Sequence, residues 1–260
     1  MATRAKNHSM PYWAGGASLI AFIVIGAAAL SHRSTPIDNR GCPDQVVGKT
    51  VFVIDQSDAM SAQTRTEILS RVTKMVDQKI AVGELVSVFS ITELSKQNLK
   101  PLFSYCKPQK EAHGPAESQR YVTANYVKNF SKPLVFAVDS PVAGSKQSPI
   151  AQALVDLSLS EYLKHPTKSR LVIFSDFLEY TERFQLYGCR DANAAVGAFK
   201  TSRGAAVARP QFRHVDVQLH IIPRPQIAPA VGQCRDAFWN WFFTDNEGQG
   251  SGFDQFYLPG

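Results

Sequence analysis

The sequence predicts an α/β domain with a doubly wound, mostly parallel sheet, one antiparallel edge strand and a preceding transmembrane helix. Two runs, Val51–Ile54 and Leu171–Phe174, contain only apolar residues, as is typical of parallel strands buried on both faces. Stretches with helical apolar spacing separate the predicted strands, and this alternation favours right-handed crossovers. An apolar run from Ala14 to Leu30 precedes all of them.

Residues 14–31 are predicted to be the transmembrane anchor. No charged residue occurs between Ser9 and Ser31, and about 20 apolar helical residues span a bilayer. Tyr12 and Trp13 stand where aromatic residues meet the membrane interface.

The charges before this segment predict its orientation. Arg4 and Lys6 favour a cytoplasmic tail over residues 1–13, so the main domain is expected in the periplasm or outside the cell. A cleaved signal peptide with Leu19–Leu30 as its apolar region is the alternative, and it also exports the domain.

Residues 32–48 are predicted to be a linker, and the domain itself to cover residues 49–248. After the first strand, Thr64 and Glu67 have the spacing of a helical capping box. Apolar residues then recur at helical spacing, and Gly83 is expected to end this helix.

The middle of the chain continues the alternation. Leu85–Ile91 and Pro101–Tyr105 are predicted strands, close enough in sequence to pair as an antiparallel hairpin. Glu117–Phe130 is a predicted helix. Another predicted helix opens at Ser148 and Pro149, with Pro149 at its first helical position.

The last part of the chain carries three predicted elements. Val215–Ile221 alternates apolar and polar residues, which predicts a half-exposed strand near an edge of the sheet. Ala237–Phe243 carries the aromatic run FWNWFF and is a predicted core helix. Residues 249–260 are expected to be a C-terminal tail.

Oxygen-bearing side chains follow both wholly apolar strands. Asp55 and Asp176 end the two strands, Ser57 lies beside the first, and Ser148 precedes a helix that reaches the same edge. Ligands of such sheets bind beyond the carboxyl ends of the strands. Two carboxylates and two hydroxyls form an all-oxygen set suited to Mg²⁺ or Mn²⁺.

These residues resemble the metal-ion-dependent adhesion motif of the von Willebrand factor A (vWA) domains. That motif is D-x-S-x-S after the first strand, a Thr before a later helix and an Asp after the fourth strand. Asp55 and Ser57 match its first two ligand positions, Ser148 stands for the Thr, and Asp176 matches the final Asp. The resemblance covers roughly residues 49–248 and includes the antiparallel edge strand.

The motif departs from the family at two positions. Ala59 replaces the second serine and supplies no ligand atom, and Phe177 replaces the usual glycine after the last Asp. The resemblance implies a Mg²⁺- or Mn²⁺-binding interaction module whose protein partner supplies an acidic side chain. A metal-free scaffold of the same fold is one alternative. In the other, Ser57, Asp58 and Ser61 only cap the following helix and Asp176 caps another turn.

A metal-dependent hydrolase or phosphatase is the third interpretation. The haloacid dehalogenase type also places an Asp at the end of an apolar strand but requires a second Asp two residues later, where this chain has Ser57. No GxSxG or GxxxxGK[ST] motif occurs. We therefore expect no enzymatic activity.

Four cysteines are expected to form two disulfides after export. In the predicted topology, Cys42 precedes the first strand and Cys106 follows the returning third strand, so both lie at the amino-end edge of the sheet. Cys189 and Cys234 lie at the opposite edge. Cα atoms of a bridge must lie within about 7 Å, which favours Cys42–Cys106 and Cys189–Cys234.

The chain has a formal charge of +6 and a pI of about 9.1. Its basic residues are scattered, and no short window combines them with aromatic residues into a stacking surface. We expect no nucleic-acid partner.

Overall fold

The computed structural model describes residues 37–91, 100–114, 117–140, 145–163, 168–204, 206, 209–210, 212, 214–244 and 253–259. The sheet formed by these residues has the strand order β3-β2-β1-β4-β5-β6. Its strands are β1 (Lys49–Asp55), β2 (Leu85–Ile91), β3 (Phe103–Cys106), β4 (Ser169–Ser175), β5 (Val215–Ile221) and β6 (Phe253–Tyr257). Only β3 runs antiparallel to its neighbour. The sheet therefore has the predicted class.

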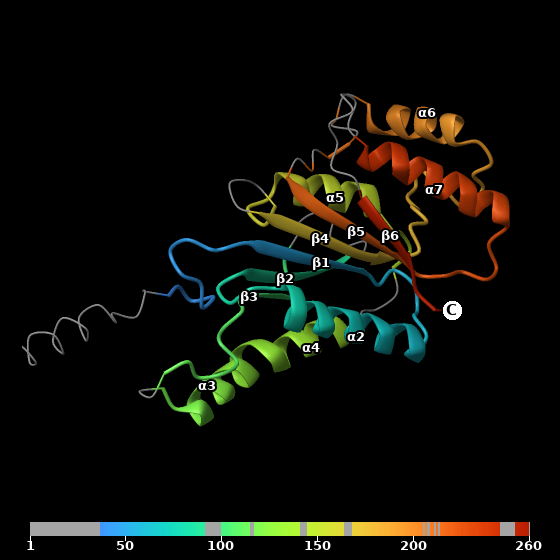
Figure 1. The fold of residues 1–260 in the computed structure, drawn as a ribbon. Coiled ribbons are helices and arrows are strands. Elements are labelled where there is room, and N and C mark those ends of the chain that lie inside the picture. Colours follow the sequence, from blue (N-terminus) through green and yellow to red (C-terminus); the bar gives the residue numbers. More distant parts are fainter. Residues whose placement is uncertain are drawn as a thin grey trace, which may run out of the picture. The chain divides into compact units, whose positions relative to one another are not determined.

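Helices cover both faces of this sheet (Figure 1). On one face lie α2 (Ala62–Lys79), α3 (Gln119–Tyr126), a π-helical turn (Val127–Ser131) and α4 (Lys132–Asp139). On the other face lie α5 (Ile150–Leu159), α6 (Ala192–Arg203) and α7 (Pro229–Phe243).

The apolar strands supply both cores. Phe52 and Phe174 belong to the core under α2 and α4, whereas Val53 and Ile173 belong to the core under α5 and α7. Successive side chains of a strand point to opposite faces, so a strand between two helical layers needs an uninterrupted apolar run. The aromatic residues of α7 are buried as predicted, Phe238 and Trp239 among them.

The register of the parallel strands brings their carboxyl ends to one edge. Ile54 lies opposite Phe174, and Phe174 lies opposite His220. We call the residues that follow these ends the rim, namely residues 55–58, 145–148, 175–180 and 222–224.

Two predictions about the C-terminal part are wrong. Residues 253–257, predicted to be part of a tail, form β6 and pair in parallel with β5. β5 is therefore an interior strand rather than a half-exposed edge, and His220, one of the polar residues of its alternation, is only 5 % exposed. Its polar face is covered because α2 and β6 bring Arg71 and Phe256 against it.

Helix boundaries also differ from the predicted ones. Ser61 rather than Thr64 caps α2, because its hydroxyl accepts a hydrogen bond from the Thr64 N–H at 3.0 Å. The helix ends at Lys79, and Gly83 serves the following turn with a φ of 81°. Pro149 is the N-cap residue of α5 rather than its first residue. α7 begins eight residues earlier than predicted, at Pro229.

The helix predicted at Glu117–Phe130 is shifted and continues further. α3 starts at Gln119, passes through the π-helical turn and continues into α4 up to Asp139. Pro133 lies in the first turn of α4. Proline cannot donate a backbone hydrogen bond, and the preceding π-helical turn accommodates that loss.

The two predicted cysteine pairs lie at disulfide distance. The Cα atoms of Cys42 and Cys106 are 5.0 Å apart, and those of Cys189 and Cys234 are 5.8 Å apart. Cys106 lies opposite Leu85, the first residue of β2, so the first pair is at the amino-end edge as reasoned from the topology. The first pair also fixes the segment before β1 to the sheet.

The predicted membrane anchor at residues 14–31 lies outside the described residues. Within the described part of the chain, no helix is both long and apolar enough to cross a bilayer.

Candidate functional site

Asp55 is the centre of a buried hydrogen-bonded cluster at the rim. Its Oδ1 accepts from the Ser57 hydroxyl at 2.7 Å and from the Ser57 N–H at 3.1 Å. Its Oδ2 accepts from the hydroxyls of Ser148 at 3.2 Å and Ser175 at 2.7 Å. The structure thus brings Asp55, Ser57 and Ser148 together, and it adds Ser175, which sequence reasoning missed.

Asp176 lies beside this cluster and is held by an arginine. Its Oδ2 lies 2.6 Å from Nε of Arg224, and its Oδ1 accepts from the Leu178 N–H at 2.9 Å. Nη2 of the same Arg224 lies 2.7 Å from Oδ2 of Asp58. One guanidinium group therefore bridges the loops that follow β1 and β4.

Burial and charge act in opposite directions on this pair. Burial and, next, the negative charge of Asp55 raise the pKa of Asp176 above its usual range, against the lowering effect of Arg224 and the Leu178 N–H. Burial disfavours the charged guanidinium, but Asp176 and Asp58 raise the pKa of Arg224. Arg224 therefore remains a permanent cation at the rim.

Phe177 explains how the rim tolerates a residue other than glycine after Asp176. Its φ is 58°, a left-handed conformation that is costly for a large side chain. The ring is buried 5.5 Å from Trp239 in edge-to-face geometry, and the Trp239 indole N–H donates to the Phe177 carbonyl at 2.7 Å. The backbone of Phe177 keeps a glycine-like conformation because Trp239 of α7 packs against its ring and donates to its carbonyl.

Glu179 is a buried acid at the rim that the sequence did not identify. Its Oε2 accepts from the Ala151 N–H at 2.8 Å, so it caps the start of α5, where Pro149 supplies no side-chain cap. Burial raises the pKa of Glu179 to about 8. No sequence signal marks this cap, because the acid lies 28 residues from the helix start that it serves.

Two hollows adjoin the Asp58–Arg224 pair. One, of about 420 Å³, is lined by residues that include Ser57, Ser148 and Tyr180. The other, of about 330 Å³, lies over the start of α7 and includes Arg224, Ile227 and Val231. Asp58 and Tyr187 line both hollows.

The two tyrosines of this region are accessible. Tyr180 is 43 % exposed and Tyr187 is 46 % exposed, and their rings meet edge-to-face at 5.8 Å. Burial and the negative charges of Asp176 and Asp58 raise the pKa of Tyr187 to about 12. The Tyr187 hydroxyl therefore stays neutral, and both rings are accessible beside Asp58 and Ser148 in the hollow that they line.

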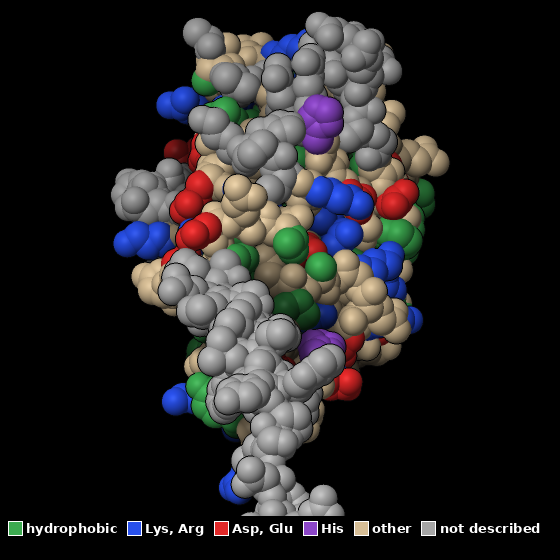
Figure 2. All heavy atoms as spheres, turned by 60° about the vertical axis from the view of Figure 1, so that its left-hand side comes forward, with side chains coloured by type: hydrophobic (Ala, Val, Ile, Leu, Met, Phe, Trp, Pro, Cys, Tyr) green, Lys and Arg blue, Asp and Glu red, His purple; other side chains and the backbone are tan. Residues whose placement is uncertain are grey.

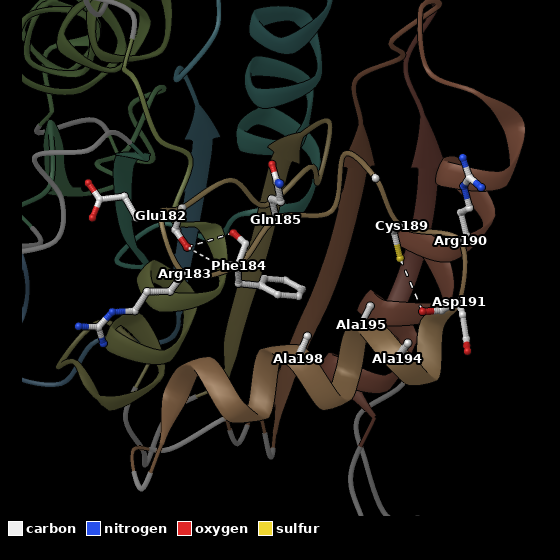
Figure 3. Close-up of a pocket in the computed structure, with 12 residues that line it drawn as sticks. Glu182, Arg183, Phe184, Gln185, Cys189, Arg190, Asp191, Ala194, Ala195 and Ala198 are labelled. Atoms are coloured by element: carbon white, nitrogen blue, oxygen red, sulfur yellow. Dashed lines mark hydrogen bonds between the residues drawn. The ribbon is translucent and has the colours of Figure 1, made fainter.

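A third hollow, of about 590 Å³, lies between residues 181–191 and α6 and contains no predicted ligand. Figure 3 shows Ala194, Ala195 and Ala198 of α6 directed toward this loop, with Arg183 pointing away. We do not include this hollow in the candidate site.

The predicted metal ligands fit a divalent ion only in part. Ser57 and Ser148 both approach one carboxylate, as ligands of a shared ion would. Against this, both oxygens of Asp176 already have donors, Ala59 contributes no oxygen, and Arg224 places a positive charge beside Asp176. In the described residues, no group of three or more His, Cys, Asp or Glu side chains is arranged to hold a metal ion.

The capping alternative holds in two places. Ser61 caps α2, and Asp176 caps the turn that follows β4 by accepting from the Leu178 N–H. Ser57 and Asp58 instead contact Asp55 and Arg224. The rim is therefore more than a set of helix caps.

No protein-family model and no curated protein matches the sequence. Several solved vWA structures are similar. The ArnB paralog VWA2 from Sulfolobus acidocaldarius is 13 % identical with a TM-score of 0.40, and the match covers 81 % of this chain and 41 % of that one. BatB from Bacteroides thetaiotaomicron is 12 % identical with a TM-score of 0.40, covering 82 % and 90 %. The SpRpn10 VWA domain is 15 % identical with a TM-score of 0.38, covering 82 % and 89 %.

These comparisons concern the arrangement of the chain and not its activity. This chain spans less than half of the Sulfolobus structure. The strand order and the register of the strands define the fold of this chain.

Proposed function

We propose that the chain is an exported, membrane-tethered, vWA-like interaction module that binds another protein at the rim. The observation that carries this proposal is the exposed Tyr180–Tyr187 pair beside the Asp58–Arg224 ion pair, with a hollow on each side. Tyrosine and arginine are enriched among the residues that contribute most to protein–protein binding.

Two features support export. Both cysteine pairs lie at disulfide distance, and disulfides persist in oxidising compartments outside the cytoplasm. The apolar segment 14–31 would carry the domain across the membrane and hold it there. We propose the periplasm or the cell exterior as its location.

The charge on one face of the molecule, away from the rim, argues against a nucleic-acid site on that face. On the face shown in Figure 2, Lys and Arg side chains are interspersed with Asp and Glu rather than gathered into one basic patch. Nucleic-acid binders concentrate basic residues along one face.

A metal-dependent rim is the second candidate, favoured by the two serine hydroxyls that share Asp55. In that form Asp55, Ser57, Ser148 and Asp176 would hold Mg²⁺ or Mn²⁺, and the partner would supply an acidic side chain. The partner's acid stays a prediction in either form, because Arg224 also offers it a cation.

Assay with a generic phosphate ester tests the hydrolase interpretation.

Site-specific photo-crosslinking tests the binding surface. A benzoylphenylalanine at position 187 in the full chain, expressed in its own cell, should crosslink to one discrete protein. The matched control carries the same group at Tyr121, an exposed residue of α3, which is 74 % exposed and lies away from the rim. Tyr180→Ser should weaken the crosslink at position 187.

The same crosslinked proteins, in equal yield, at positions 187 and 121 would contradict the proposal. So would crosslinking at position 187 that is unchanged by Tyr180→Ser, since the two rings are in contact.

A further inference from the structure

Arg224 joins three loops that are far apart in sequence. It lies three residues after β5, and its partners Asp58 and Asp176 follow β1 and β4. The separations along the chain are 166 and 48 residues. A single guanidinium thus connects the carboxyl ends of three adjacent strands of the sheet.

The contacts use the planar shape of the guanidinium group. Nε and Nη2 each meet a different carboxylate at 2.6 and 2.7 Å, distances typical of charge-assisted hydrogen bonds. The Asp176 carboxylate is 5 % exposed, while the arginine side chain is 27 % exposed. Arg224 therefore neutralises a buried acid and still reaches the surface.

A divalent ion at Asp176 would have to displace this arginine. Mg²⁺ requires oxygens at about 2.1 Å in near-octahedral geometry. Both carboxylate oxygens of Asp55 accept hydrogen bonds, from three hydroxyls and one N–H. Both oxygens of Asp176 accept from Arg224 and the Leu178 N–H, and Ala59 has no side-chain oxygen. The arginine has the further advantage that it is covalently attached and needs no free ion.

We infer that Arg224 is the resident cation of the rim and makes the rim independent of divalent metal. Its guanidinium group holds the carboxylates of Asp58 and Asp176 together as a bound metal ion would. The guanidinium therefore occupies the role of the ion at this rim. This inference goes beyond partner binding and does not depend on it, because its test needs only the purified chain.

Calorimetric titration of the full chain with MnCl₂ and MgCl₂ tests the inference. The wild type should show no saturable binding tighter than about 1 mM, the weak limit for extracellular oxygen-ligand sites. The double variant Arg224→Gln with Ala59→Ser should bind Mn²⁺ at least about tenfold more tightly than the wild type. Arg224→Lys with Ala59→Ser keeps a positive charge at the rim but cannot reproduce both guanidinium contacts, so it should bind Mn²⁺ more weakly than the Arg224→Gln double variant.

A thermal measurement provides a second readout. Arg224→Gln should unfold at a lower temperature than the wild type, and Mn²⁺ should restore part of that loss, whereas the wild type should not respond to Mn²⁺. The matched control Arg183→Gln removes the same charge from an exposed position in the loop after β4. It should change neither metal affinity nor metal response.

Saturable Mn²⁺ binding by the wild type, tighter than about 1 mM, would overturn the inference without any variant. A double variant that folds, as judged by circular dichroism, and binds no more Mn²⁺ than the wild type would also overturn it.

Discussion

Replacing His220 with phenylalanine should remove much of the acid sensitivity of the folded chain. His220 is stacked between Phe174 at 4.7 Å and Phe256 at 5.0 Å, measured between ring centroids. Its Nδ1 lies 3.1 Å from Nη1 of Arg71, and its Nε2 has no hydrogen-bond partner among the described residues. A proton added to this ring would therefore place a second positive charge beside an arginine in a buried position.

The size of the effect follows from the shift in pKa. Burial and then the charge of Arg71 lower the pKa of His220 from 6.5 to about 4, with Glu67 acting in the opposite direction. The unfolded chain takes up this proton near pH 6.5 and the folded chain only near pH 4. The free energy of unfolding therefore falls as the pH falls through this window. At 1.36 kcal/mol per pKa unit, the loss is about 3 kcal/mol when the window has been crossed.

Urea unfolding of the full chain, followed by circular dichroism at about pH 7 and about pH 4.5, measures this loss. The wild type should lose about 2 kcal/mol more than His220→Phe between the two conditions, because a pH of about 4.5 lies just above the end of the window. Phe256→Leu is the control, because it removes one stacked ring but keeps the titrating group. Its free energy of unfolding should be lower at both pH values and should still fall toward the lower pH, less steeply than in the wild type, because Phe256 helps to bury the ring. Equal pH dependence in His220→Phe and the wild type would refute the reasoning.

Two further predictions concern buried acids and disulfides. Glu179→Gln should remove a pH dependence of opposite sign: because the folded pKa is raised from 4.5 to about 8, the wild type should lose stability relative to the variant as pH rises between these values. Unfolding curves at about pH 5 and about pH 8 would show it, and parallel curves for variant and wild type would count against it. The double substitution Cys42→Ser with Cys106→Ser removes a disulfide between residues with a sequence separation of 64. The added entropy of the unfolded chain should lower the free energy of unfolding by about 4 kcal/mol. A loss in urea unfolding below about 1 kcal/mol would show that this bridge does not constrain the unfolded chain.

The parts of the fold that could be predicted are those whose signal is local. β1 and β4 are buried on both faces by helices, and this burial requires apolar runs that are visible in the sequence. The alternation of β5 indicates a half-exposed strand, whereas pairing with β6 buries Gln218 and His220, and Arg71 contacts His220; of its polar residues Asp216 stays exposed. β6 is short and largely exposed, and although three of its five residues are aromatic, it has no regular apolar alternation, so its pairing with β5 defines it as a strand.

The same distinction applies to the candidate site. Asp55, Ser57 and Ser148 could be placed together because each follows or precedes a recognisable element. Arg224 could not, since it lies in a loop between β5 and α7 and nothing in its neighbours indicates its partners. Its two ion pairs depend on the register of three strands, which a single sequence does not reveal.

The most direct test of the account is the anomalous scattering of manganese in crystals of the chain soaked in MnCl₂. If Arg224 is the resident cation, no manganese peak appears at the rim and the guanidinium of Arg224 remains within hydrogen-bonding distance of Asp176. A manganese peak bound by Asp55, Ser57 and Ser148, with Arg224 displaced from Asp176, would contradict it.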